Sequence, residues 1–181
     1  MGKSNEALVA QEVDNVAEDS IMPQREQRQQ MSRRREIRMT PEEQTAFLQQ
    51  ARKAALATLD QQGFPHIVAM GFVVLDGVMY MTSYAKAQKV LNARRNPKVS
   101  VMIETGTDYA EFRGVMIRGQ CEVIEDPTFV RHILQANRTP QTDTGNPAGQ
   151  EALARATKRV VLKILPEKVV SWDHTKLGGR Y

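Results

Sequence analysis

Hydroxyl, amide and amine side chains are concentrated in one short stretch of this 181-residue sequence, from residue 82 to residue 89. Thr82 and Ser83 end an apolar run, and Lys86, Gln88 and Lys89 follow them at the start of an expected short helix. Hydroxyls and backbone N–H groups donate to phosphate oxygens, a helix N-terminus favours negative charge, and lysine adds a full positive charge. The stretch has the composition of an anion-binding cradle, although lysines at a helix start are also common as plain solvated side chains.

The elements on either side would hold this stretch in place. Phe72 to Leu75 and Val78 to Met81 are apolar runs joined by Asp76-Gly77, a pair that favours a type I′ turn and so predicts a β-hairpin. Asn96-Pro97 ends the short helix, and Lys98 to Ile103 is expected to be the next strand.

The rest of the chain predicts a mainly β (α+β) fold. Thr40-Pro-Glu-Glu is a helix start, with a capping threonine, proline at the first helical position and acidic residues in the first turn. Further strands are expected at 54–59, 65–75, 111–124, 159–165 and 168–172, with Pro166 separating the last two, and a helix at 127–137. Six or seven strands joined mostly by tight turns indicate a small antiparallel β-barrel with peripheral helices.

Composition suggests one folded domain, at residues 37–181, preceded by an arm at residues 1–36. The arm is rich in glutamine and arginine, so it is expected to be extended or disordered. Arg25 to Arg38 is basic, but nucleic-acid binding is not the favoured role of such a run. No apolar stretch resembles a signal peptide or a membrane span, and the single cysteine excludes an internal disulfide, so a cytoplasmic protein is expected.

Common catalytic motifs are missing from the sequence. The three histidines, His66, His132 and His174, lie far apart without metal-ligand spacing, so no metal site is expected. No nucleophile elbow, phosphate-binding loop or dinucleotide-binding glycine motif is present. The catalytic residues cannot be named from the sequence, and any enzyme activity would depend on a bound redox cofactor.

Several motifs occur in an order that is typical of one family. They are Thr40-Pro-Glu-Glu, Ala57-Thr58-Leu59, Gly63-x-Pro65-His66, residues 82–89, Asn96-Pro97, residues 112–116 with Gly119, and Val170-Ser-Trp-Asp173. Over residues 40–173 the chain resembles the pyridoxamine 5'-phosphate oxidase-like split-barrel family of flavin and deazaflavin proteins, and most of all its subgroup of coenzyme F420-dependent reductases.

The resemblance implies a homodimer with F420 or FMN in a groove at the subunit interface. The strand that contains Val68 and Met70 would line the three-ring head of the cofactor, partly through its backbone, while Met70 could equally be a core residue. Thr82, Ser83 and Lys89 match the residues that hold the phosphate end, and Lys86 and Gln88 occupy positions where relatives often carry further phosphate ligands.

Two more residues enter through the same resemblance. Trp172 would lie beside the cofactor groove or simply pack on the barrel. Arg113 would assist the cofactor or pair with Glu104 or Glu111. Gly114 replaces the glutamine of true pyridoxamine-phosphate oxidases, and the residues after Trp172 do not reproduce their arginine-and-histidine motif, so that activity is not expected.

The sequence therefore predicts an oxidoreductase that transfers hydride between reduced F420 or FMN and an unidentified conjugated small molecule. A non-catalytic flavin- or haem-binding protein of the same fold is the alternative. A protein that acts on nucleic acid or a membrane surface through its basic arm is a third hypothesis.

Overall fold

The computed structural model describes residues 33–137 and 156–179. The predicted arm before residue 33 and the loop expected at 138–149 lie outside these ranges. Residues 33–36 are helical, and the described residues from Arg34 onward belong to one compact unit.

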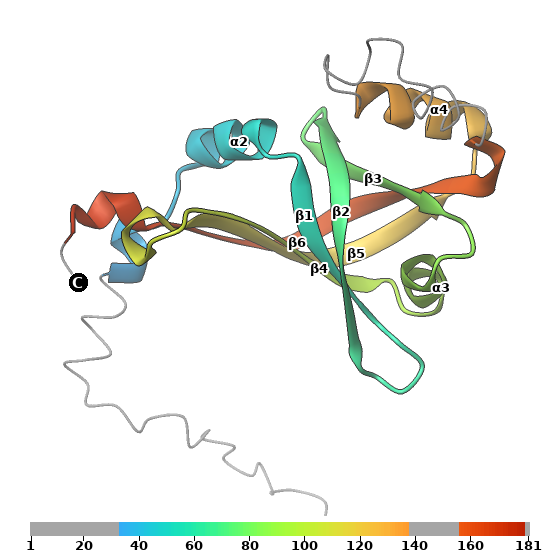
Figure 1. Ribbon diagram of the computed structural model, residues 1–181, viewed down its shortest axis with the longest axis horizontal. Helices are drawn as coiled ribbons and strands as arrows, with labels where there is room; N and C mark the ends of the chain where they lie inside the picture. Colours follow the sequence, from blue (N-terminus) through green and yellow to red (C-terminus); the bar gives the residue numbers. More distant parts are fainter. Residues whose placement is uncertain (1–32, 138–155, 180–181) are drawn as a thin grey trace, which may run out of the picture. The chain divides into compact units, whose positions relative to one another are not determined.

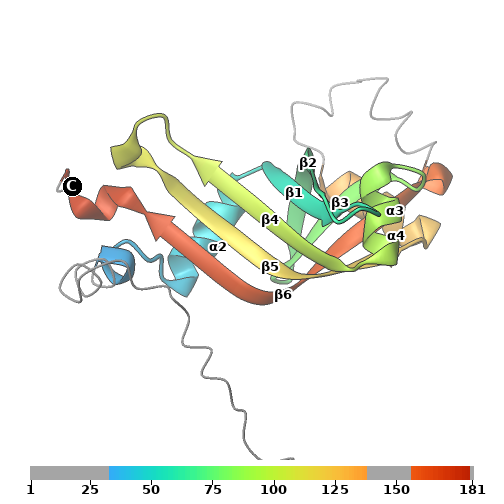
Figure 2. The ribbon, with the colours of Figure 1, turned by 90° about the horizontal axis from the view of Figure 1, so that it is seen from below.

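Six antiparallel strands form a closed barrel in the order β1-β2-β3-β6-β5-β4, which confirms the predicted fold class (Figure 1). The strands are β1 (Lys53–Leu59), β2 (Pro65–Leu75), β3 (Val78–Tyr84), β4 (Lys98–Thr105), β5 (Arg113–Ile124) and β6 (Arg159–Asp173). β4, β5 and β6 run side by side, and Figure 2 shows them extending beyond the rest of the barrel.

Besides the helical residues 33–36, the described chain contains three α-helices, which cover the barrel: α2 (Pro41–Gln50), α3 (Gln88–Arg95) and α4 (Pro127–Ala136). Short 3-10 turns are η1 (Tyr109–Glu111), η3 (Ala156–Lys158) and η4 (His174–Leu177). α3 and α4 lie at one end of the long strands, and α2 lies nearer the other end (Figures 1 and 2). No described helix has the length and hydrophobicity needed to cross a bilayer.

Local sequence signals explain how α2 and the central hairpin form. The Thr40 hydroxyl accepts a hydrogen bond from the Glu43 N–H, and the Glu43 carboxylate accepts one from the Thr40 N–H, so the predicted helix start is a complete capping box. Asp76 and Gly77 have φ values of 51° and 77°, as the predicted turn requires.

The alternation of side chains along the strands builds two cores. Leu56, Phe72, Val101 and Leu162 are among the residues that fill the barrel, and Val90 of α3 joins them at one end. A smaller cluster lies beneath α4 and contains Val130, Ile133, Ala156 and Val161. The second cluster holds α4 on the outside of β3 and β6.

The expected strand break at Pro166 is wrong, because β6 continues through it from Arg159 to Asp173. The pairing with β5 shifts register between Arg118 and Gly119, opposite Pro166. A proline lacks the N–H that a regular ladder uses, so it is tolerated where a bulge interrupts the ladder. The long bent strand thereby joins both ends of the barrel.

Candidate functional site

Ser83 and Lys89 come together where β3 ends and α3 begins. The Ser83 side chain is only 5% exposed, and Lys89 Nζ donates a hydrogen bond to Ser83 Oγ at 3.5 Å. Lys89 is half-buried and pairs with no carboxylate of the described residues. A partly desolvated lysine without an acidic partner favours an anion beside it.

A buried polar network fixes the helix that carries Lys89. Asn92, fully buried in α3, donates from Nδ2 to Thr58 Oγ1 of β1 at 3.1 Å. Asn92 Oδ1 accepts from Gln88 Nε2 at 2.8 Å, and Arg95 donates to the Leu59 carbonyl. Because an unpaired buried amide costs about 1–3 kcal/mol, this network holds α3 in one position against β1.

Sequence reasoning did not assign this supporting role to Thr58 and Asn92. One available signal was a single hydroxyl within the apolar run of β1. The other was an asparagine four residues after Gln88, a spacing that places Gln88 and Asn92 on one helix face.

His66 is a further residue to which sequence reasoning gave no binding role, although it appeared in the motif Gly63-x-Pro65-His66 and was considered as a metal ligand. It lies directly opposite Thr58 in the pairing of β1 with β2, so the two side chains share the inner face of the barrel wall. Its Nδ1 atom is buried and has no hydrogen-bond partner among the described residues. A buried ring nitrogen without a partner next to the Thr58–Asn92 network fits a polar group of a bound ligand.

β2 leaves part of one edge open close to this cradle. It pairs with β1 from Pro65, which lies opposite Leu59, to Gly71, which lies opposite Lys53. Its pairing with β3 includes only Phe72 to Leu75. On the β3 side, the stretch from Pro65 to Gly71 has no partner strand within the described residues. The N–H and C=O groups of such an edge can bind the polar rim of a planar heterocycle.

The structure does not bring all the expected site residues together. Val68 and Met70 face the barrel core, so β2 could contact a cofactor there only through its backbone. Thr82 and Ser83 are neighbours in a strand and point to opposite faces, which leaves only Ser83 beside Lys89. Lys86 is exposed in the loop before α3.

Arg113 and Trp172 lie near the far end of the long strands. Ser83 pairs with Val160 of β6, and Trp172 follows Val160 by twelve residues, which is roughly 40 Å along a strand. Trp172 lies on Gly114, where a Cβ atom would come within 2.2 Å of the indole ring. Within one chain, Lys89 and Trp172 cannot contact the same small molecule.

Arg113 is held by a different carboxylate from the two expected. Its Nε lies 2.9 Å from Oδ2 of Asp173, which is buried, and its guanidinium carbon lies 5.7 Å from the centre of the Phe47 ring. This arrangement indicates a structural role for Arg113 within its own chain.

Cys121 is the only cysteine, and burial raises the pKa of its thiol to about 12. At about pH 8 we therefore expect the native protein to react very slowly with dithiodipyridine, and the protein unfolded in guanidinium to react at the rate of a free thiol. Rapid labelling of the native protein would show that the strand opens or that the thiol is accessible.

No described histidine, cysteine, aspartate and glutamate side chains form a group that could hold a metal ion.

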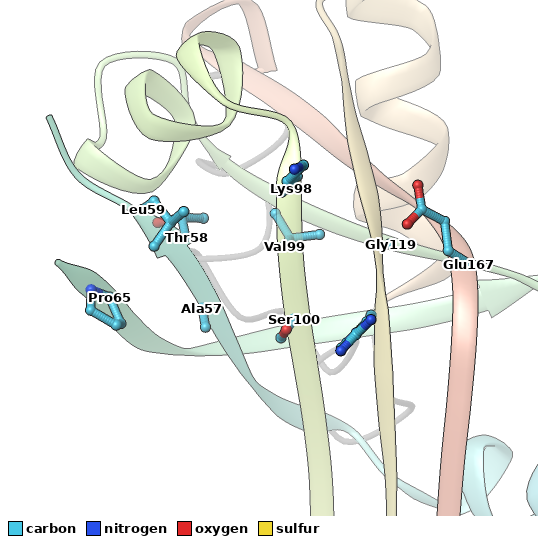
Figure 3. Close-up of a pocket in the computed structure, with 10 residues that line it drawn as sticks. Ala57, Thr58, Leu59, Pro65, Lys98, Val99, Ser100, Gly119 and Glu167 are labelled. Atoms are coloured by element: carbon cyan, nitrogen blue, oxygen red, sulfur yellow. The ribbon is translucent and has the colours of Figure 1, made fainter. Parts of the chain in front are cut away.

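A separate cavity of about 410 Å³ lies on the outer face of the barrel wall (Figure 3). It is bounded by β1, the start of β2, β4, β5 and the bend of β6, and is lined by Ala57, Thr58, Leu59, Pro65, Lys98, Val99, Ser100, Arg118, Gly119 and Glu167. Thr58 reaches both sites, since its hydroxyl belongs to the Asn92 network.

Comparisons with known proteins agree with this fold. The sequence pattern of the family described as pyridoxamine 5'-phosphate oxidase matches residues 40–173. The crystal structure of a conserved hypothetical protein from Mycobacterium tuberculosis is 32% identical over 82% of this chain and 94% of that one, with a TM-score of 0.72.

Two further solved structures share the fold. An F420 reductase is 25% identical over 68% of this chain and 93% of that one, with a TM-score of 0.53. A FAD-binding protein from Mesorhizobium loti is 24% identical over 74% of this chain and 94% of that one, with a TM-score of 0.57. No curated protein matches the sequence. The chain belongs to the pyridoxamine 5'-phosphate oxidase-like family of split barrels.

Proposed function

We propose that this protein binds F420 or FMN and acts as an oxidoreductase on a conjugated small molecule, with hydride transfer supplied by the bound cofactor. The observation that carries the proposal is the half-buried Lys89 beside Ser83, close to the open edge of β2. Ser83, Lys89 and His66 would hold the phosphate end, and backbone groups of β2 would orient the ring. The likeness to an F420 reductase supports the same assignment.

The chain's own residues would act by binding and orientation. Hydrogen bonds from backbone N–H groups to a ring stabilise negative charge that develops on it. Arg113 is committed to Asp173 and Cys121 is buried, so neither is offered as an acid, base or nucleophile. A non-catalytic flavin- or haem-binding protein is the second candidate, and turnover of an acceptor with reduced cofactor distinguishes it from the oxidoreductase.

Lys89→Ala should weaken binding of the cofactor about ten- to a hundredfold, because a lost charge-assisted bond to phosphate is worth about 1.5–3 kcal/mol. Titrations with FMN and with F420, followed by fluorescence, would measure the two dissociation constants and show which cofactor binds. Lys98→Ala removes a lysine that has no contact with the Ser83–Lys89 pair and is the matched control. Equal affinity of Lys89→Ala and the parent would show that the cradle is misplaced.

We also propose that the cofactor site is completed by a second copy of the chain. An outward-facing row crosses five strands in register, and its members are Ala69, Ala55, Met102, Met116 and Val170. Met102 and Val170 are 41% and 37% exposed, and Ile67 in the adjoining row is 64% exposed. An apolar band of this kind suits a self-complementary twofold interface, which would bring Trp172 of one protomer toward the cradle of its partner.

Light scattering of the intact protein at micromolar concentration, with cofactor present, should give the mass of a dimer. Met102→Lys should give a folded monomer, because it places a charge in the centre of the apolar row. Lys53→Gln, on the same sheet but outside the row, is the control. A monomeric mass for the parent protein would count decisively against the shared cofactor site.

A further inference from the structure

The cavity beside β4 combines two cations with an apolar floor. Lys98 and Ser100 are two residues apart on β4 and face outward, and Ser100 lies directly opposite Arg118 of β5. Figure 3 shows Lys98 and Ser100 on the strand between β1 and β5. These groups place two positive charges and a hydroxyl along one wall.

The two cations have no acidic partner in the described part of the chain. No carboxylate there forms an ion pair with Lys98 or Arg118. Glu167 also lines the cavity, but its Oε1 accepts a hydrogen bond from Gln120 Nε2 at 2.7 Å. Glu167 keeps its negative charge in that hydrogen bond, so the two cations and this one carboxylate leave the lining with one net positive charge.

The bulge in β6 lies beside Arg118. The register shifts immediately after Arg118, because Arg118 pairs with Lys168 and Gly119 with Pro166, which leaves Glu167 as the extra residue of the bulge. Gly119 allows the Leu165 carbonyl to come so close that a Cβ atom would lie 2.0 Å from its oxygen. This local geometry lines the cavity with backbone on one side and presents Arg118 on the other.

The opposite wall is apolar. Ala57, Leu59 and Pro65 supply most of it, across β1 and the start of β2. Ligand sites commonly combine such a surface with a few converging polar groups in a volume of about 300–1,000 Å³.

We propose that this cavity is a second ligand site, which binds a small organic anion through Arg118, Lys98 and Ser100 and packs its flat apolar body on Ala57 and Pro65. The anionic group is a carboxylate or a phosphate. Lys89 and Ser83 take no part in this site. Ala57, Ser100 and Arg118 lie in register with Ile67, so the cavity adjoins the row proposed as the dimer interface.

Calorimetric titration of the full-length protein with benzoate, phenyl phosphate and benzamide tests the site. Benzoate or phenyl phosphate should bind once per chain with a dissociation constant of about 1 mM, as expected for a small fragment, and the uncharged benzamide should bind at least tenfold more weakly. The better of the two anions identifies the head group. Inorganic phosphate alone should bind more weakly than phenyl phosphate, because it lacks the apolar body.

Arg118→Gln should weaken binding of the preferred anion tenfold or more, and Lys98→Gln should weaken it several-fold. Lys53→Gln, which removes the same charge from the same sheet outside the cavity, should change nothing. If Arg118→Gln does not fold, amide chemical shifts of Val99, Ser100 and Gly119 in the labelled parent protein should still move on addition of the anion. Shifts confined to other residues would overturn the proposal.

Two other results would also overturn it. One is equal binding of benzamide and benzoate, which would show that the cations are not used. The other is a combined result in which no anion binds to the parent protein, and Arg118→Gln is a monomer although the parent is a dimer. That result would show that a carboxylate of a second copy pairs with Arg118. Titration of Arg118→Gln with FMN and F420 keeps the two sites apart, since its cofactor affinity should equal that of the parent even if the anion site fails.

Discussion

Replacing Asp173 with alanine should lower the free energy of unfolding by about 2–3 kcal/mol, because it removes the ion pair with Arg113 and both hydrogen bonds that the buried carboxylate accepts from Thr175. Asp173 is 5% exposed, lies 2.9 Å from Arg113 Nε, and accepts hydrogen bonds from the N–H and hydroxyl of Thr175. Its own N–H donates to the Ile37 carbonyl at 2.7 Å. One carboxylate therefore joins β5, the end of β6 and η4.

Urea unfolding followed by circular dichroism would measure the change. Asp173→Asn keeps the shape but removes the charge, so it should fall between the parent and Asp173→Ala. The control is Glu122→Ala, which breaks the surface ion pair with Lys163 and should cost at most about 1 kcal/mol. Equal stability of Asp173→Ala and Glu122→Ala would show that Arg113 is well solvated without its partner.

Gly119→Ala should be destabilising by about 3 kcal/mol, which corresponds to a fall in Tm of about 6–12 °C for a chain of this size. The added Cβ would lie 2.0 Å from the Leu165 oxygen and 3.0 Å from Pro166 Cα, and both are backbone atoms that cannot rotate away. The bulge would have to open, and Arg118 would move with it.

Gly71→Ala is the matched control for this prediction. Gly71 is also a strand glycine, but the atom nearest to its added Cβ is the side-chain nitrogen of Asn137 at 3.3 Å, which can move. Differential scanning calorimetry should therefore show a small change for Gly71→Ala and a large one for Gly119→Ala. Equal Tm values would mean that β6 can shift at the bulge without cost.

Much of the fold could be predicted because its signals are local. Asp76-Gly77 specified the hairpin, and Thr40-Pro-Glu-Glu specified the start of α2. The predicted strand break at Pro166 was wrong because the register shift that tolerates this proline depends on β5, a strand more than forty residues earlier in the chain. A rule for one strand cannot detect a bulge that two strands share.

The site was predictable only in part for the same reason. Ser83 and Lys89 were found because they lie in one short stretch, next to a helix start. The cavity was not found, because Ser100 and Arg118 alternate with core residues on different strands and become neighbours only through register. The opposite orientations of Thr82 and Ser83 likewise follow from the strand, which residue types alone do not reveal.

The closure of the barrel has a consequence for its motions. β1 and β4 meet in only three residue pairs, Ala55–Met102, Leu56–Val101 and Ala57–Ser100, whereas β5 and β6 pair along most of their length. Sub-global opening begins where few bonds must break, so native-state hydrogen exchange should be fastest along this seam of the barrel. Ala57 and Ser100 lie on its two sides and both line the cavity. A molecule held between them would bind the closed barrel and not the opened one. It would therefore stabilise the pairing of β1 with β4 against opening.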